Sequence, residues 1–168
     1  MGYKLRIGNL NVQYFQDEED PFIRLRAECL RHDNAPAFGE ITDYGNSREP
    51  SYTAWHDFAQ FVGLYNLFFG NEPFNKERVR DDALLANHPG CVPLTERHRC
   101  EINAALAAYK AKFPKAIPTF GKPAQEGEIF WVDKENPEEN AYMARLIWLH
   151  YWVNWALDNC EKPVFENT

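Results

Sequence analysis

NPEENAYMARLIWLHYWVNWALDNC, residues 136–160, decides the fold. A helix is expected here, with Asn136 as the N-cap, Pro137 at the first helical position and acidic residues in the first turn. Apolar residues recur on one face at helical spacing, and three tryptophans form a second apolar stripe beside them. A helix that is apolar on two sides is expected at the centre of a core or an interface. The first stripe contains Tyr142, Leu146, Leu149, Val153, Ala156 and Cys160, and the second contains Trp148, Trp152 and Trp155.

The composition is that of one globular domain. The chain has 168 residues, 45% of them hydrophobic, which is enough to bury a core, so a single domain spanning residues 1–168 is expected. Aromatic residues make up 15%, which favours a core or a pocket built from large flat rings. The formal net charge of −7 argues against non-specific binding to duplex nucleic acid, because that binding needs a basic surface.

The sequence predicts a cytoplasmic protein. No signal-peptide pattern follows Met1, and no apolar run approaches the roughly 20 residues of a membrane span. The helix at 136–160 contains Arg145, His150 and Asn154, so no membrane partner is expected. The four cysteines lack the spacing of a disulfide framework and are expected to be free thiols.

The N-terminal segment predicts a small antiparallel meander. Residues 3–15 alternate between apolar and polar side chains, with Gly8 and Asn9 as the two-residue turn of a hairpin. The acidic run at 17–21 predicts a loop. Residues 22–29 alternate again, which predicts a third strand.

Two further long helices are predicted, at Ser51–Phe69 and Thr95–Phe113. A short charged helix is expected at 75–86, and a strand or extended arm at 128–133. The expected class is α+β, in which the N-terminal meander packs on three main helices and the helix at 136–160 is central.

Cationic and aromatic side chains form the main candidate binding site. The cations of the meander would face outward together, and guanidinium groups suit phosphate or carboxylate. Tryptophan would stack on a planar ring, which is worth roughly 1–3 kcal/mol per base. A nucleotide-like small molecule, bound without a cofactor between subunits of a homo-oligomer, fits both features. The alternatives are a solvated sheet face and a packed core or homodimer seam. The candidate residues are Arg6, Arg24, Arg26, Tyr44, Trp148, Trp152 and Trp155.

Cysteine and histidine residues suggest a different kind of site. Cys29 with His32, and His88 with Cys91, each place two potential ligands three positions apart, and together they would form a four-ligand zinc site. No CxxC motif accompanies them, and Cys29 is also explained as a buried strand residue. The enzymatic alternative is a metal-dependent hydrolase around His88, Cys91 and His98, although the chain carries no known catalytic motif.

Three stretches resemble small uncharacterised proteins encoded by bacteriophages. They are SYTAWHDFAQFVGLYNLFF at 51–69, HPGCVPLT at 88–95 and WVNWALDNCEKPVF at 152–165. The resemblance implies an accessory factor that acts in the host cytoplasm, and it assigns no functional residue. We therefore expect a non-enzymatic counter-defence protein that sequesters a nucleotide-like ligand. The alternative is an acidic inhibitor that mimics nucleic acid or occupies a basic cleft of another protein.

Overall fold

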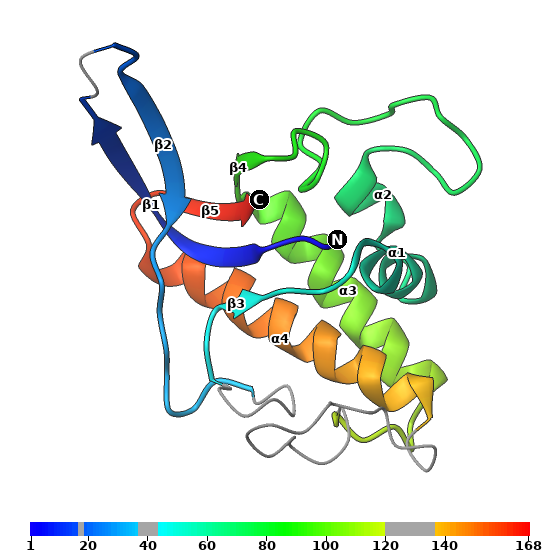
Figure 1. Ribbon diagram of the computed structural model, residues 1–168. Helices are drawn as coiled ribbons and strands as arrows, with labels where there is room; N and C mark the ends of the chain where they lie inside the picture. The colour runs from blue at the N-terminus through cyan, green and yellow to red at the C-terminus, as the bar shows by residue number, and fades with distance from the viewer. Residues whose placement is uncertain (17–18, 37–43, 120–136) are drawn as a thin grey trace.

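A curved antiparallel sheet packed against helices forms the described part of the chain (Figure 1). The structure is a computed structural model, and it describes residues 1–16, 19–36, 44–119 and 137–168. The arrangement confirms the expected α+β class. The strands are β1 (Leu5–Phe15), β2 (Phe22–Ala27), β3 (Ser47–Arg48), β4 (Gly90–Pro93) and β5 (Pro163–Asn167). The helices are α1 (Tyr52–Phe61), α2 (Tyr65–Phe69), α3 (Glu96–Lys112) and α4 (Glu138–Asn159).

The long strand β1 pairs with different neighbours along its length. Its first half, from Leu5 to Asn9, lies antiparallel to β5, and its second half, from Leu10 to Phe15, lies antiparallel to β2 on the other edge. β4 continues the sheet beyond β5, so the order is β2-β1-β5-β4, with the short β3 also beside β1. The sheet is therefore built from both ends of the described chain rather than from an N-terminal meander alone.

The predicted hairpin turn at Gly8 and Asn9 is wrong, because both residues continue β1 and pair with β5. A Cβ at Gly8 would lie 3.1 Å from the carbonyl oxygen of Glu28 and 3.2 Å from the Asn46 side chain. This glycine therefore marks a close approach of neighbouring chain segments rather than a turn. The predicted third strand is confirmed as β2, and β1 and β2 form the hairpin on either side of the acidic run.

The predicted helix at 51–69 is two helices, α1 and α2. Ser51 caps α1, since its hydroxyl accepts a hydrogen bond from the backbone N–H of Ala54 (3.1 Å). Gly63 has a left-handed backbone (φ 77°), which glycine adopts without strain. It follows the end of α1 and breaks the helix within the apolar pattern of residues 51–69. Gly70 (φ 79°) ends α2, next to the predicted end of the helix at Phe69.

The helix predicted at 75–86 does not form, and these residues make turns and extended chain. Arg80 explains the difference, because its buried side chain forms ion pairs with Asp82 (2.6 Å) and with Glu101 of α3 (2.7 Å). Charged residues that suggested a helix surface thus anchor a loop to α3. The strand predicted at 128–133 lies outside the described residues.

The helix α4 is central, as predicted. It contacts α3 on one side and β1 and β5 on the other (Figure 1). α3 begins directly after Thr95, which is its N-cap and the first residue of the predicted range. α4 has Pro137 at its N-cap, one residue later than predicted. Both apolar stripes contribute residues that are completely buried, namely Leu146, Trp148, Leu149, Trp152, Val153 and Ala156.

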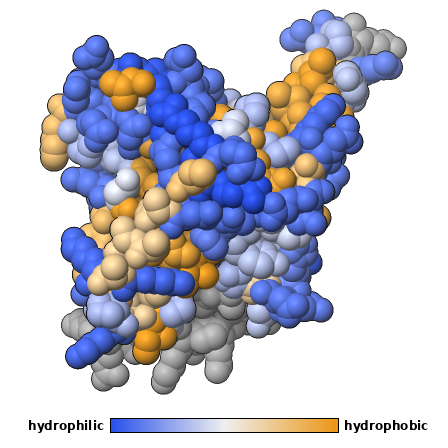
Figure 2. Space-filling model, turned by 180° about the vertical axis from the view of Figure 1, so that it is seen from behind, coloured by the Kyte–Doolittle hydropathy of each residue, from blue (hydrophilic) through white to orange (hydrophobic). Residues whose placement is uncertain are grey.

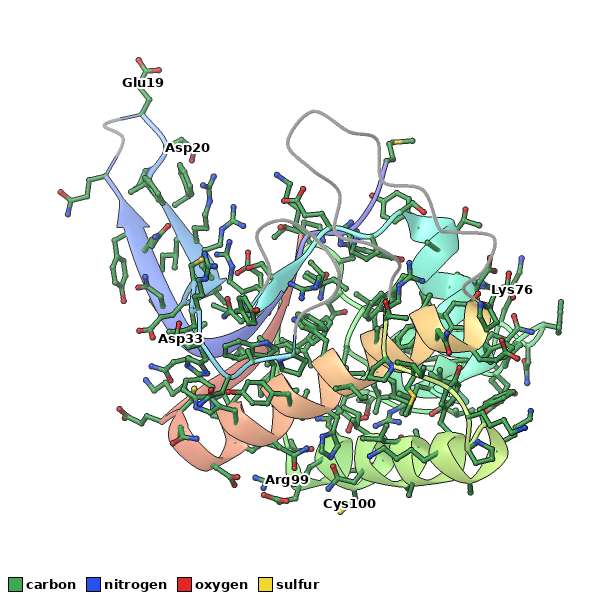
Figure 3. All side chains as sticks on the ribbon, turned by 90° about the horizontal axis from the view of Figure 1, so that it is seen from below. Glu19, Asp20, Asp33, Lys76, Arg99 and Cys100 are labelled. Atoms are coloured by element: carbon green, nitrogen blue, oxygen red, sulfur yellow. The ribbon has the colours of Figure 1, made fainter. Side chains whose placement is uncertain are left out.

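The outer half of the β1–β2 hairpin projects from the body of the molecule as an arm (Figures 1 and 2). Residues 11–15 of β1 and 22–25 of β2 are exposed. Glu19 and Asp20 lie at the end of this arm (Figure 3). The part of the sheet that packs on helices therefore ends near Leu10 and Ala27.

Candidate functional site

The structure separates the predicted tryptophans from the predicted arginines. Trp148 and Trp152 are completely buried, and the Trp148 indole N–H donates to the carbonyl oxygen of Gly45 (3.0 Å). Trp155 is partly buried and packs against the rings of Trp152 and His32, with centroid distances of 5.6 and 4.6 Å. These tryptophans therefore belong to the core, and none of them lines the cavity described below.

Tyr44 and Arg24 also lie apart from the other predicted site residues. Tyr44 is exposed and has a left-handed backbone (φ 80°), and the Arg31 guanidinium lies 5.8 Å from its ring centroid. The Arg24 guanidinium lies over the rings of Phe15 and Phe22 on the arm, at 5.3 and 5.8 Å. Both side chains are engaged locally.

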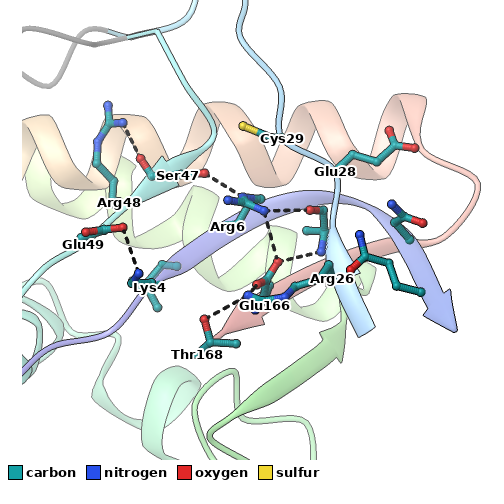
Figure 4. A pocket seen from close by; sticks show the side chains of 14 residues that line it. Lys4, Arg6, Arg26, Glu28, Cys29, Ser47, Arg48, Glu49, Glu166 and Thr168 are labelled. Atoms are coloured by element: carbon teal, nitrogen blue, oxygen red, sulfur yellow. Dashed lines mark hydrogen bonds and ion pairs between the residues drawn. The ribbon is translucent and has the colours of Figure 1, made fainter. Parts of the chain in front are cut away.

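Arg6 and Arg26 are brought together in a pocket of about 490 Å³, which we call the arginine pocket (Figure 4). It lies on β1, the base of β2, β3 and β5. Arg6 alternates along β1 with Leu5 and Ile7, which are buried in the core, so the pocket occupies the opposite face of the sheet. Its wall includes four cationic side chains, Lys4, Arg6, Arg26 and Arg48, and three acidic ones, Glu28, Glu49 and Glu166.

The buried carboxylate of Glu166 links the two arginines. Glu166 is only 2% exposed, and one of its oxygens accepts a hydrogen bond from Nη1 of Arg26. The other lies 3.8 Å from Nη1 of Arg6 and accepts the backbone N–H of Ala27 (2.8 Å). A single side chain of β5 thus fixes the base of β2 and positions both guanidinium groups.

Both arginines keep donors that no described residue accepts. Arg6 donates through Nε to Ser47 (2.9 Å) and through Nη1 to the carbonyl oxygen of Ala27 (3.3 Å). Arg26 uses Nη1 for Glu166 and for Thr168 (3.4 Å). Nη2 of Arg6 and both Nε and Nη2 of Arg26 have no protein acceptor among the described residues. The side chains of Arg6 and Arg26 are 31% and 30% exposed, so these donors can reach a ligand.

Sequence reasoning found the two arginines and missed most of the residues around them. Arg48 lies on β3, and its guanidinium is 5.1 Å from the ring centroid of Trp148, so it connects the pocket wall to the core. Glu166 belongs to β5 and Thr168 directly follows it, and no strand was predicted for this segment. The alternation in the last residues was the available signal, but five residues after a long helix are too few to distinguish a strand from a tail.

The cysteine and histidine alternatives do not assemble. Among the residues that the structure describes, no three His, Cys, Asp or Glu side chains are placed to hold a metal ion. His88 contacts Asn167 (3.1 Å), whereas the His98 ring accepts the Thr95 backbone N–H (3.0 Å) and donates to the carbonyl oxygen of Asp82 (2.7 Å). Burial raises the pKa of the Cys91 thiol to about 11, so this thiol stays protonated and is a poor nucleophile.

No family model, curated protein or solved structure matches this chain. None of the described helices is both long and apolar enough to pass through a lipid bilayer. The interpretation of the arginine pocket therefore rests on its geometry alone: a polar recess lined by four cationic and three acidic side chains, in which guanidinium donors have no acceptor among the described residues.

Proposed function

We propose that this protein is a non-enzymatic binding protein that captures a small anion of the nucleotide or phosphate-ester class in the arginine pocket. The supporting observation is the pair of half-exposed arginines, Arg6 and Arg26, whose outer donors have no protein acceptor among the described residues. Guanidinium groups bind phosphate oxygens through paired, charge-assisted hydrogen bonds. Sequestering such a ligand suits the counter-defence role that the bacteriophage resemblance implies.

Preorganisation supports the same proposal. Glu166 holds both arginines from below, and Ser47 holds Arg6 from the side, so little side-chain entropy remains to be lost when a ligand binds. The pocket volume of about 490 Å³ lies in the range of small-molecule sites, roughly 300–1,000 Å³. The buried tryptophans cannot stack on a base, so the phosphate is the part of the ligand that the protein recognises.

A thermal-shift panel tests the proposal. The panel contains inorganic phosphate, pyrophosphate, mononucleotides, cyclic dinucleotides and ADP-ribose. At about 100 times the Kd, a bound ligand stabilises the folded state by about 2.7 kcal/mol, which raises the Tm of a domain of this size by roughly 5–10 °C. An unchanged Tm across the whole panel at millimolar concentration would refute the proposal.

Substitutions locate the site. Arg26→Gln and Arg6→Gln should each raise the Kd of the tightest-binding ligand of the panel by at least about tenfold, as measured by calorimetric titration. The matched control is Arg24→Gln, because Arg24 is the same residue type two positions away on β2 and does not line the pocket. An equal loss with Arg24→Gln and Arg26→Gln would place binding elsewhere, and urea unfolding of each variant separates lost binding from lost folding.

A further inference from the structure

The projecting arm has one face that is entirely apolar. In the register of β1 and β2, Val12 lies opposite Leu25 and Tyr14 lies opposite Ile23, so these four side chains share one face. Tyr14 is 73% exposed and Ile23 is 61% exposed, and the other two are also exposed. Hydrophobic residues run along the arm in Figure 2. We call these four residues the apolar arm face; such a contiguous apolar patch on a soluble domain indicates an interaction surface.

The opposite face of the arm is already occupied by its own side chains. Phe15 and Phe22 stack on each other with ring centroids 4.7 Å apart, and the Arg24 guanidinium lies over both rings. Cation–π contact and stacking thus cover much of the apolar surface there. The apolar arm face has no comparable cover among the described residues.

We propose that the apolar arm face is a homodimer contact, in which it packs on the same face of a second copy of this chain across a two-fold axis. The face is uncharged along its length, so it is complementary to itself, which is the condition for an isologous interface. The carboxylates at 17–20 repel nucleic-acid phosphates and anionic lipid headgroups, which disfavours both as occupants. This proposal does not depend on ligand binding in the arginine pocket.

The exposed area predicts a weak, reversible dimer. The exposed fractions of the four side chains correspond to no more than roughly 400 Å² per copy, since a fully exposed aromatic side chain presents about 150–250 Å² and the three aliphatic ones present less. A stable interface buries about 800 Å² per partner. The arm alone supplies about half of that area, so we expect a dissociation constant between about 1 and 100 µM.

The acidic end of the arm sets the orientation. Glu19 and Asp20 place two carboxylates at the described tip (Figure 3), and two more acidic residues, Asp17 and Glu18, precede them in the sequence. If the two arms ran parallel, these groups would meet and repel one another. The two arms therefore run antiparallel, so that each acidic end points away from the other.

Sedimentation velocity from about 1 to about 200 µM tests the proposal and should show a dimer that forms with increasing concentration. Tyr14→Lys should weaken the dimer at least about tenfold, because it places a charge in the apolar contact. Gln13→Lys adds the same charge at the next residue of β1, on the other face, and should change the dissociation constant less than about threefold. Both positions are exposed, so neither variant should unfold the protein.

Three results would overturn the proposal. A monomer at every concentration would leave the apolar arm face to another protein or without an occupant. A dimer that Tyr14→Lys and Gln13→Lys weaken equally would form through another surface. The double variant Glu19→Gln, Asp20→Asn removes two tip charges, and a dimer strengthened more than about threefold by it would contradict the antiparallel arrangement.

Discussion

Replacing Glu166 by glutamine should weaken folding and strengthen anion binding. In the native protein its carboxylate accepts hydrogen bonds from Arg26 and from the backbone of Ala27 and lies 3.8 Å from Arg6. A glutamine amide oxygen can still accept the Ala27 N–H, but its amide group offers no acceptor to Arg26. The variant therefore loses one charge-assisted hydrogen bond and one ion pair while keeping the shape of the side chain.

The two expected magnitudes follow from these contacts. A hydrogen bond to a charged group is worth about 1.5–3 kcal/mol, and part of its loss is offset because a buried carboxylate no longer has to be desolvated. We expect the free energy of unfolding to fall by about 1–2 kcal/mol. One charge roughly 7 Å from a bound anion contributes about 2 kcal/mol at an effective dielectric constant near 20. Solvent in the half-open pocket reduces that value, so the affinity should rise about tenfold.

Urea unfolding measures the first effect, and calorimetric titration with pyrophosphate and with the tightest nucleotide of the panel measures the second. Glu28→Gln is the matched control, because Glu28 also lines the pocket but is exposed. Removing its negative charge should change the affinity for the anion less than about threefold. The reasoning fails if Glu166→Gln lowers stability and leaves anion affinity unchanged or reduced. In that case the orientation that Glu166 gives the two guanidinium groups matters at least as much for anion binding as the negative charge that it places beside them.

Two other predictions concern stability. Hydrogen bonding from the Arg80 guanidinium lowers the pKa of the Asp82 carboxyl, so Asp82 contributes stability that is complete above its unfolded-state pKa of about 4 and is lost as the pH falls through the folded pKa. Urea unfolding from pH 7 down to pH 2 should therefore show a loss of stability below about pH 4 that Asp82→Asn reduces, and an identical profile for that variant would contradict this assignment. Trp148→Ala should cost about 3–5 kcal/mol of unfolding free energy and Trp155→Ala less than about half of that, because only the first ring is completely buried; equal small losses would contradict the core assignment of Trp148.

Helices with strong periodicity were predictable from the sequence. α3 and α4 carry long apolar patterns and begin within two residues of their predicted starts, so local information was sufficient. The single helix predicted at 51–69 failed at Gly63, where a left-handed residue interrupts a pattern that continues on both sides. The spacing of the apolar residues indicates which face of a helix is buried. It does not reveal a break in the helix when the residues on both sides of the break bury the same face.

The sheet and the site were less predictable because they depend on distant partners. From the sequence alone, Gly8 is equally compatible with a turn and with a close approach between neighbouring chain segments. Only the pairing of β5 with β1 decides between these two interpretations. The bond between Arg26 and Glu166 joins residues 140 positions apart. The alternation in β2 predicted that the Arg26 side chain points away from the core. No local pattern could identify the carboxylate of Glu166 to which it donates.

The aromatic helix that decides the fold contributes to the candidate site indirectly. Its tryptophans are buried, and Trp148 meets the pocket through Arg48 of β3. The pocket itself is built where the two ends of the chain meet: the backbones of Lys4 and Thr168 exchange two hydrogen bonds, of 2.7 and 3.0 Å. Arg6 lies on β1 and Arg26 on β2, and these strands already pair with each other, while β1 also pairs with β5. An anion held by both arginines would therefore add a bridge between two strands that the backbone hydrogen bonds and Glu166 have already brought together.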